Sequence, residues 1–326
     1  MELFKVRFFK PEDTESWNHL VAHASQPSFL FFRDFMTYHQ HLFIDASVVV
    51  ENNLGKLVAL LPAHVKGINI YSHFGLTYGG MVVPEKCTSL QWMKYFYLVL
   101  EFLYQQGFEK LFWKEIPSFY GTSPRDEFSY LTFITQARLQ ERHLCQVVDL
   151  QCDIQLTTDR KAGVKRGIQN QLYVQLSNQW EYFYHQLLLP NLQDKHQQKP
   201  VHSLEEMLIL HQKFPNNIQL YGVFQEQQIV AGTILFISSN VVHSQYIASN
   251  KAKNLLGSLD FLHHELLTTF FSHKKYFDFG ISHELKGTKI NEGLFYWKQG
   301  FGAKPIRQDI YEIEIKNYPL IQEVWI

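Results

Sequence analysis

The sequence predicts a mixed α/β protein built from two halves of ordinary domain size. Its 326 residues are too many for one small domain. Hydrophobic residues make up 46% of the chain and charged residues 19%, a composition that can bury a core and excludes wholesale disorder. Segments with strand patterning alternate with segments of helical periodicity along the chain. We therefore expect two domains, residues 1–152 and 153–326, that share an element order.

In the first half, turn and capping residues separate the expected elements. Pro11 ends the first strand, and residues 13–16 can cap the helix that follows. Residues 52–55 have hairpin chemistry, Ser89 can cap a long helix, and Gly107 can end that helix. Strands are expected at 3–9, 46–52, 56–65, 108–116 and 143–151, strand and loop at 71–83, and helices after residue 13 and at 29–39, 90–106 and 124–136.

The second half repeats helices, then a strand meander, then a helix and a strand. Pro190 is expected to stop one helix, and the polar stretch 191–202 reads as a surface loop. Ser203 and Glu206 have the spacing of a capping box. Helices are expected at 157–172, 180–189, 203–214, 258–272 and 291–300, and strands at 173–177, 218–226, 228–238, 241–249, 275–282 and 307–315.

Charge and cysteine usage narrow the functional class. The formal net charge is −1, which lacks the basic footprint of a DNA-binding protein, although a local basic patch could still serve tRNA. The three cysteines form no C-x-x-C pair, the N-terminus lacks a signal-peptide pattern, and no apolar run reaches membrane-spanning length. The 16 histidines are scattered, so no metal site is predicted. These features predict a cytoplasmic protein, and they leave its oligomeric state open.

A strand meander followed by a polar loop and a helix that starts at Gly257 resembles the GNAT acyltransferase fold. In that family, the loop before this helix binds the pyrophosphate of coenzyme A, and free amides at a helix start favour an anion. The resemblance implies acyl-coenzyme A as the cofactor. Leu259 stands where the family has a second small residue, and a plain helix cap at Ser258 is the alternative. The implied contacts are Lys253, Asn254, Leu256, Gly257 and Ser258.

A second block, Asp278-Phe279-Gly280 followed by Lys298-x-x-Phe301-Gly302, is similar to the C-terminal block of FemAB-like acyltransferases. Tyr78-Gly79-Gly80 looks like an element of their first halves. The resemblance implies two tandem GNAT-like domains with a substrate cleft, without the coiled-coil arm of some members. It also implies N-acyl or aminoacyl transfer to an amine on a small or carrier-linked acceptor, such as an amino sugar or a cell-envelope precursor. Aminoacyl-tRNA is the alternative donor.

Candidate site residues follow from strand ends and from the resemblance. Asp278, Glu284 and His243 are the candidate proton acceptors, because a carboxylate or imidazole could take the amine proton. An Asx turn at Asp278 and an ordinary interior hydrogen bond at His243 are the alternatives. For Arg33, a partly buried ion pair is as good an interpretation as substrate contact. The candidate substrate-binding residues are Arg33, Tyr78, Gln245, Tyr246, Ser282, Asn291 and Lys298.

Two other functional classes compete with the transferase. The incomplete phosphate loop is compatible with a binding or assembly protein whose GNAT fold has lost its donor. A serine hydrolase is disfavoured, because Ser72-His73 lies in no G-x-S-x-G turn. The sequence therefore predicts an N-acyltransferase, with a non-catalytic binding protein and an aminoacyl-tRNA-dependent transferase as the alternatives.

Overall fold

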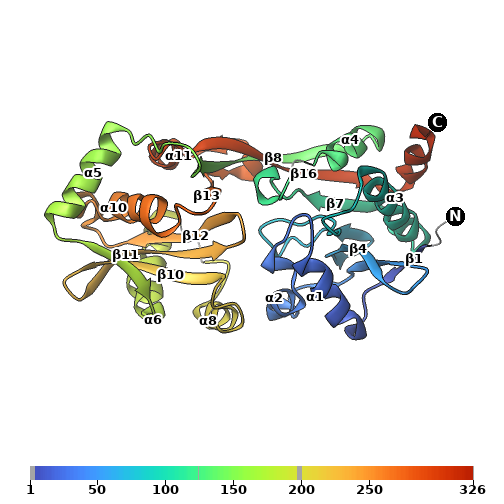
Figure 1. Ribbon diagram of the computed structural model, residues 1–326, viewed down its shortest axis with the longest axis horizontal. Helices are drawn as coiled ribbons and strands as arrows, with labels where there is room; N and C mark the ends of the chain where they lie inside the picture. Colours follow the sequence, from blue (N-terminus) through green and yellow to red (C-terminus); the bar gives the residue numbers. More distant parts are fainter. Residues whose placement is uncertain (1–3, 124, 197–199, 326) are drawn as a thin grey trace. The chain divides into compact units, whose positions relative to one another are not determined.

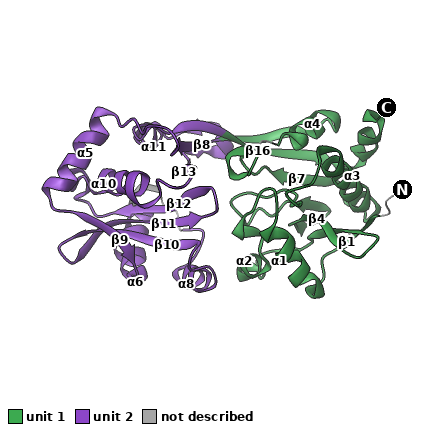
Figure 2. Cartoon of the chain, in the orientation of Figure 1, with its two compact units in different colours: residues 1–143, 307–326 green, residues 144–306 purple. Residues whose placement is uncertain are grey.

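A computed structural model describes residues 4–123, 125–196 and 200–325. The chain forms two compact units, residues 1–143 with 307–326 and residues 144–306 (Figure 2). The chain passes between them within strands β8 (Arg138–Asp149) and β16 (Lys304–Glu314) (Figure 1). These bounds differ from the predicted division at residues 152 and 153. Strand β16 pairs with β7 (Lys110–Lys114) of the first unit, so residues 307–326 belong to that unit.

The first unit contains two groups of strands. In one, β3 lies between β1 and β4, and both pairings are antiparallel. In the other, the order is β2-β5-β6-β7-β16, with only β6 and β7 parallel. The expected single strand at residues 56–65 is two strands, since Pro62 lacks the amide hydrogen that would continue the ladder. The strand bounds are β1 Phe4–Phe8, β2 Ile44–Asp45, β3 Val48–Asn52, β4 Leu57–Leu61, β5 His64–Lys66, β6 Asn69–Tyr71 and β7 Lys110–Lys114.

Helices of the first unit mostly follow the predicted pattern, with two corrections. The expected helix at residues 29–39 is three short helical segments, and the extended Phe32 separates the first from the other two. The long helix is capped by Thr88 and not by Ser89, because the Thr88 hydroxyl and the Gln91 side chain accept each other's backbone amides. The helical segments are η1 Pro11–Asp13, α1 Thr14–Ala22, η2 Phe29–Phe31, α2 Arg33–Met36, η3 Thr37–His39, α3 Ser89–Gln105, η4 Ser118–Tyr120, α4 Glu127–Ile134 and η8 Ile315–Val324.

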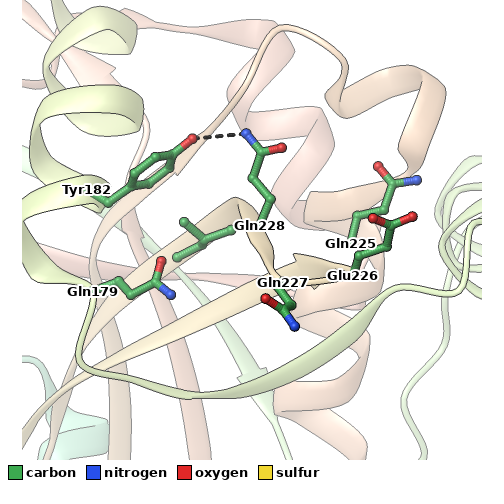
Figure 3. Close-up of a pocket in the computed structure, with 7 residues that line it drawn as sticks. Gln179, Tyr182, Gln225, Glu226, Gln227 and Gln228 are labelled. Atoms are coloured by element: carbon green, nitrogen blue, oxygen red, sulfur yellow. Dashed lines mark hydrogen bonds between the residues drawn. The ribbon is translucent and has the colours of Figure 1, made fainter.

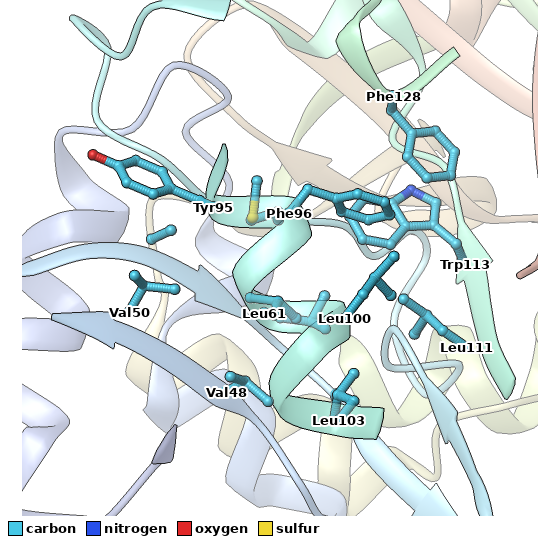
Figure 4. Packing of buried hydrophobic residues seen from close by; sticks show 14 of the residues in the cluster. Val48, Val50, Leu61, Tyr95, Phe96, Leu100, Leu103, Leu111, Trp113 and Phe128 are labelled. Atoms are coloured by element: carbon cyan, nitrogen blue, oxygen red, sulfur yellow. The ribbon is translucent and has the colours of Figure 1, made fainter. Parts of the chain in front are cut away.

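Helix α3 supplies much of the first unit's core. Figure 4 shows Phe96 and Leu100 of α3 packed beside Trp113 and Phe128. The rings of Trp113 and Phe128 are stacked, with centroids 4.4 Å apart. The buried face of α3 includes Trp92, Tyr95 and Val99, whereas Leu90 is 62% exposed. Aromatic residues make up 15% of the chain, and in this unit they serve packing.

The second unit is built on a sheet with the order β8-β13-β12-β11-β10-β9. Only β12 and β13 are parallel to each other, and every other pairing is antiparallel. This is the predicted meander with the later strand added beside it. The bounds are β9 Tyr173–Ser177, β10 Ile218–Gln225, β11 Gln228–Ile237, β12 Val241–Ser249 and β13 Tyr276–Ile281, with a separate hairpin of β14 His283–Glu284 and β15 Lys289–Ile290 around η7 Leu285–Gly287.

One helical run corrects the expected stop at Pro190. The run continues through this proline into residues that were expected to form a loop. The preceding turn is a π-helix, whose wider spacing suits a residue without an amide hydrogen. Residues 197–199 of the expected loop lie outside the described residues. The bounds are α5 Thr158–Gln169, α6 Trp180–Tyr182, η5 Phe183–Leu188, α7 Leu189–His196, α8 Leu204–Lys213, α9 Lys253–Leu256, α10 Ser258–Glu265, η6 Leu266–Phe270 and α11 Glu292–Gln299.

Close helix packing positions α10 over the second core. A Cβ atom at Gly167 of α5 would lie 2.5 Å from the Cβ of Phe261, so the two helices touch through glycine. Beneath α10, the core includes Leu262, Phe277 and Phe301. Among the described residues, none of the helices combines the length and apolar character that a membrane crossing requires.

Candidate functional site

Strands β12 and β13 separate at the pair His243 and Asp278. Their parallel pairing covers three residue pairs and ends there. Beyond this point β12 runs on beside β11 to Ser249, while β13 pairs with β8. Two polar side chains thus occupy the fork, and strands that separate leave backbone groups available for a ligand.

A β-bulge shapes the fork on its β8 side. Asp278 pairs with Val147 and Ile281 with Cys145, so Phe279 and Gly280 lie opposite the single residue Gln146. Gly280 has φ +69°, and a Cβ atom there would lie 3.1 Å from the His243 ring. Only glycine adopts this conformation without strain.

His243 and Asp278 form a hydrogen-bonded dyad. The Nδ1 atom of His243 lies 2.8 Å from Oδ2 of Asp278, and the Gly280 amide donates to Oδ1 at 2.7 Å. Asp278 is 1% exposed, whereas His243 is half-buried. Because a carboxylate only accepts, Nδ1 carries the proton of the neutral ring, and Nε2 is left as an acceptor. The arrangement can take a proton from a bound amine. The two alternative interpretations are also present: the Gly280 amide makes an Asx-type contact with Asp278, and His243 makes an interior hydrogen bond.

Lys298 of α11 brings a buried ammonium group to the same bulge. It is 3% exposed, and Nζ donates to the carbonyl oxygens of Ile281 at 2.7 Å and Gly280 at 3.1 Å. Burial lowers the pKa of Lys298 to about 8, and the nearby Asp278 offsets part of that effect. The two carbonyls engage two of three donor hydrogens. The geometry could therefore present a positive donor to a polarised carbonyl oxygen.

The other predicted residues after β13 differ in their surroundings. Ser282 is buried, and its hydroxyl has no hydrogen-bond partner among the described residues. Asn291 caps α11, since its side chain accepts from the Leu294 amide at 3.0 Å. Glu284 is exposed on β14, and no hydrogen bond or ion pair of the described residues joins it to the dyad. Of this group, Ser282 and Lys298 therefore lie at the bulge with Asp278.

A second bulge changes the predicted faces of β12. Ser244 pairs with Leu235 and Tyr246 with Ile234, which leaves Gln245 as the extra residue. His243 and Tyr246 therefore share a face, whereas strict alternation along the strand would place Tyr246 on the face opposite His243. The Tyr246 hydroxyl lies 2.9 Å from Nδ1 of His202 and 3.1 Å from its backbone amide. Tyr246 thus anchors the segment before α8.

Arg33 and Tyr78 are engaged inside the first unit. The buried Arg33 guanidinium pairs with Asp45 and lies 3.7 Å from the centroid of the Phe9 ring. The buried Tyr78 hydroxyl lies 2.9 Å from Oγ of Ser28. For Arg33, the contacts match the alternative of a buried ion pair. For both residues, substrate contact stays a prediction.

Helix α5 covers the expected phosphate site. The predicted loop at residues 250–254 already turns into α9, and Gly257 has φ +71° between α9 and α10. A Cβ atom on Gly257 would lie 2.1 Å from the Gly163 carbonyl oxygen of α5, and Leu256 and Ser258 are buried. The first turn of α10 also carries Asp260, which pairs with Arg160 of α5.

Lys253 is half-buried and Asn254 is exposed on the α9 turn. The Gly257 amide already donates to the Lys253 carbonyl oxygen at 2.8 Å, and the Asp260 carboxylate would repel a phosphate there. The geometry therefore gives no support for coenzyme A contacts at Gly257 and Ser258, and a donor at this helix start stays a prediction.

A cavity of about 610 Å³ lies elsewhere in the second unit, at the turn between β10 and β11. Figure 3 shows its amide-rich lining, in which the Gln228 side chain donates to the Tyr182 hydroxyl at 3.1 Å. The lining includes Ile229, whereas His243 pairs with Phe236, seven residues farther along β11. At about 3.3 Å per residue the separation is about 23 Å, so this cavity is distinct from the dyad.

Sequence reasoning missed Gln146, which lies opposite the bulge with its side chain fully buried. The available signal was its position as a polar residue between Cys145 and Val147 in an apolar strand. Such a residue is costly to bury without a purpose.

Comparison with known proteins defines the fold. No family model matches the sequence, and no curated protein matches it. The structure is similar to that of FemX, with a TM-score of 0.67 and 9% identity over 98% of this chain and 99% of that chain. It is also similar to L-PGS from Bacillus licheniformis, with a TM-score of 0.55 and 13% identity over 96% of this chain and 94% of that one.

A third similar structure is a tandem GNAT protein from the clavulanic acid biosynthesis pathway. Its TM-score is 0.50, with 11% identity over 96% of this chain and 99% of that chain. The expected mixed α/β class and the FemAB-like resemblance are confirmed at the level of fold, along nearly the whole chain. The protein therefore has a tandem GNAT fold.

Proposed function

We propose that the protein is an N-acyltransferase whose site is the fork between β12 and β13. The observation that carries the proposal is the convergence of a half-buried imidazole, a buried carboxylate and a buried ammonium group on one β-bulge. Groups of this kind concentrate at reactive sites. The tandem GNAT fold supports the same class by analogy only.

Each group has a distinct part in the proposed reaction. The acceptor amine attacks the carbonyl carbon of the donor, and Nε2 of His243 takes the proton that the amine releases. Asp278 holds the ring in the required tautomer and stabilises the imidazolium. The Lys298 ammonium donates to the oxyanion of the tetrahedral intermediate. The C–N bond forms, the C–O or C–S bond to the carrier breaks, and the leaving oxygen or sulfur receives the proton from His243.

The donor is a thioester such as acyl-coenzyme A or an ester such as aminoacyl-tRNA. The acceptor is an amine on a small or carrier-linked molecule, such as an amino sugar or a cell-envelope precursor. The covered start of α10 weighs against phosphate binding at Gly257, so the donor must be identified by experiment.

The full chain should be incubated with a panel of acyl-coenzyme A compounds or aminoacyl-tRNAs and with amine acceptors, and amide products measured by mass spectrometry. We expect His243→Gln and Lys298→Met each to lower the rate at least about 100-fold. His185→Gln, which changes an exposed histidine by the same substitution, should leave the rate unchanged. Product formation at the wild-type rate in both site variants would refute the assigned roles.

A non-catalytic binding protein is the second candidate, and α5 packed over the start of α10 is the observation that favours it. Thermal shift with the same donors separates the two. Lys253→Glu is a better probe here than substitution of Gly257, where any side chain would collide with α5. Binding of a donor without amide formation from any acceptor would favour the second candidate.

A further inference from the structure

Three buried side chains around the β13 bulge carry polar atoms that no described residue satisfies. They are both amide atoms of Gln146, the hydroxyl of Ser282 and Nε2 of His263. Gln146 and His263 are fully buried, and Ser282 is 3% exposed. A buried donor or acceptor without a partner destabilises the fold, so three such side chains around one bulge call for a physical explanation.

The strand register places two of them at the bulge. Gln146 is the single β8 residue opposite Phe279 and Gly280. Ser282 follows Ile281, whose carbonyl oxygen accepts from the Lys298 ammonium at 2.7 Å. Gln146 and Ser282 therefore flank the carbonyls that hold Lys298.

His263 approaches the same bulge from α10. Its ring centroid lies 5.1 Å from that of Phe279 and 5.0 Å from that of Trp297, the residue next to Lys298. The Nδ1 atom lies 2.8 Å from the Leu259 carbonyl oxygen, so Nδ1 carries the proton and Nε2 is an acceptor. Burial lowers the pKa of His263 to about 4, which keeps the ring neutral.

The unpaired atoms complement the ammonium beside them. Gln146 offers one donor group and one acceptor, Ser282 offers one of each, and His263 offers an acceptor. The two carbonyls occupy two of the ammonium's three hydrogens. Water can donate and accept at once, and buried water in proteins commonly bridges such groups through about three hydrogen bonds.

We propose that Gln146, Ser282 and His263 hold buried water that solvates the Lys298 ammonium, and that Gln146 is a positioning residue for Lys298. Before the donor binds, the water gives the ammonium's third hydrogen a partner and satisfies the buried amide; during transfer, the oxyanion takes the place of the water at that hydrogen. The inference rests on the proposed role of Lys298 in transfer, but it concerns the charge state of that residue and needs no turnover to be observed.

The charge state of Lys298 depends on groups from each neighbouring element. Asp278 of β13 and Cys145 of β8 favour the ammonium form, and a charge on His263 of α10 would oppose it. On β12, His243 is hydrogen-bonded to Asp278. The proposed water adds solvation to these effects, so its loss should make the ammonium easier to deprotonate.

The test is an NMR titration of Lys298 in the full chain labelled with ¹³C,¹⁵N-lysine, with the signal assigned by its loss in Lys298→Met. We expect Gln146→Leu, which removes the water's partner, to lower the midpoint by at least one pH unit. Gln146→Glu, which adds a carboxylate at the same place, should raise it. Gln308→Leu is the matched control, because Gln308 is a buried glutamine whose amide donates to Thr77 and Glu115 carbonyls in the first unit.

A crystal structure at about 1.5 Å should show water bound to the Gln146 amide. Unchanged midpoints in both Gln146 variants, or a dry Gln146 side chain in that crystal structure, would overturn the proposal. Circular dichroism identifies a variant that fails to fold, and in that case the crystal structure decides alone. If the transfer assay yields no amide product, the titration still tests the proposed water. If the titration midpoint is unchanged, the transfer assay still tests the proposed function.

Discussion

The buried histidines of the first unit predict a stability that falls steeply in mild acid. His64 of β5 and His73 are 6% and 4% exposed, and their ring centroids are 5.4 Å apart. The His64 ring stacks on Tyr71, with centroids 5.1 Å apart. Burial, reinforced by the nearby His39, lowers the pKa of His64 to about 4 and that of His73 to about 3. Both rings are therefore neutral in the folded protein at pH 5.

The sign and size of the effect follow from linkage. In the unfolded chain each ring titrates near pKa 6.5, so below that pH the unfolded state binds protons that the folded state does not. The stabilisation is complete above pH 6.5 and is lost as the pH falls through the interval from 6.5 to about 4 for His64 and about 3 for His73. At pH 5, about 1.5 units below the unfolded pKa, each ring costs about 2 kcal/mol of unfolding free energy, and the pair about 4 kcal/mol.

Urea denaturation at pH 7.5 and pH 5.0 measures this loss. The test variant is His64→Phe with His73→Asn: phenylalanine keeps the stacking on Tyr71, and asparagine tolerates the left-handed backbone of His73, which has φ +56°. We expect the wild type to lose about 4 kcal/mol more than this variant between the two pH values. The exposed His41 supplies the control His41→Asn, which should behave as wild type. Equal losses in wild type and double variant would refute the reasoning.

Three further predictions concern residues of the second unit, and Gly55 of the first unit serves as a control. Gly280→Ala should cost about 1–2 kcal/mol in urea denaturation and slow transfer, because it imposes a strained φ of +69° and crowds the His243 ring. Gly257→Ala should cost at least about 2 kcal/mol, and clearly more than Gly55→Ala, whose Cβ would meet nothing within 4 Å; equal losses would contradict the packing argument. The transfer rate should fall as the pH rises through about 8, where Lys298 loses its ammonium proton, and a rate that is flat to pH 10 would remove Lys298 from the mechanism.

Local chemistry made many elements predictable. The capping box of Ser203 and Glu206 starts α8 as expected, and β9 has the predicted bounds. These features depend on residues close together in the chain, and so periodicity and capping suffice to find them. Pro190 does not end its helix as predicted, because the preceding turn is a π-helix that accommodates a residue without an amide hydrogen. Such a turn depends on packing.

Local sequence patterns predicted only part of the candidate site. His243, Asp278 and Lys298 were named from strand ends and from a family resemblance, and the structure brings these three to one bulge. Strict alternation gives Tyr246 the wrong face, because a bulge in β12 shifts the alternation. Gln146 was not found, because its importance comes from a strand pairing that the sequence does not reveal.

The sequence by itself determined the α/β class, the meander and the chemistry available at the end of β13, since each follows from side-chain periodicity and from short spacings. Only the tertiary structure decided how distant segments meet. It placed β8 opposite the bulge and α5 over Gly257, and it returned β16 to the first unit. These outcomes depend on burial and on hydrogen bonding between residues far apart in the chain, which local patterns cannot encode.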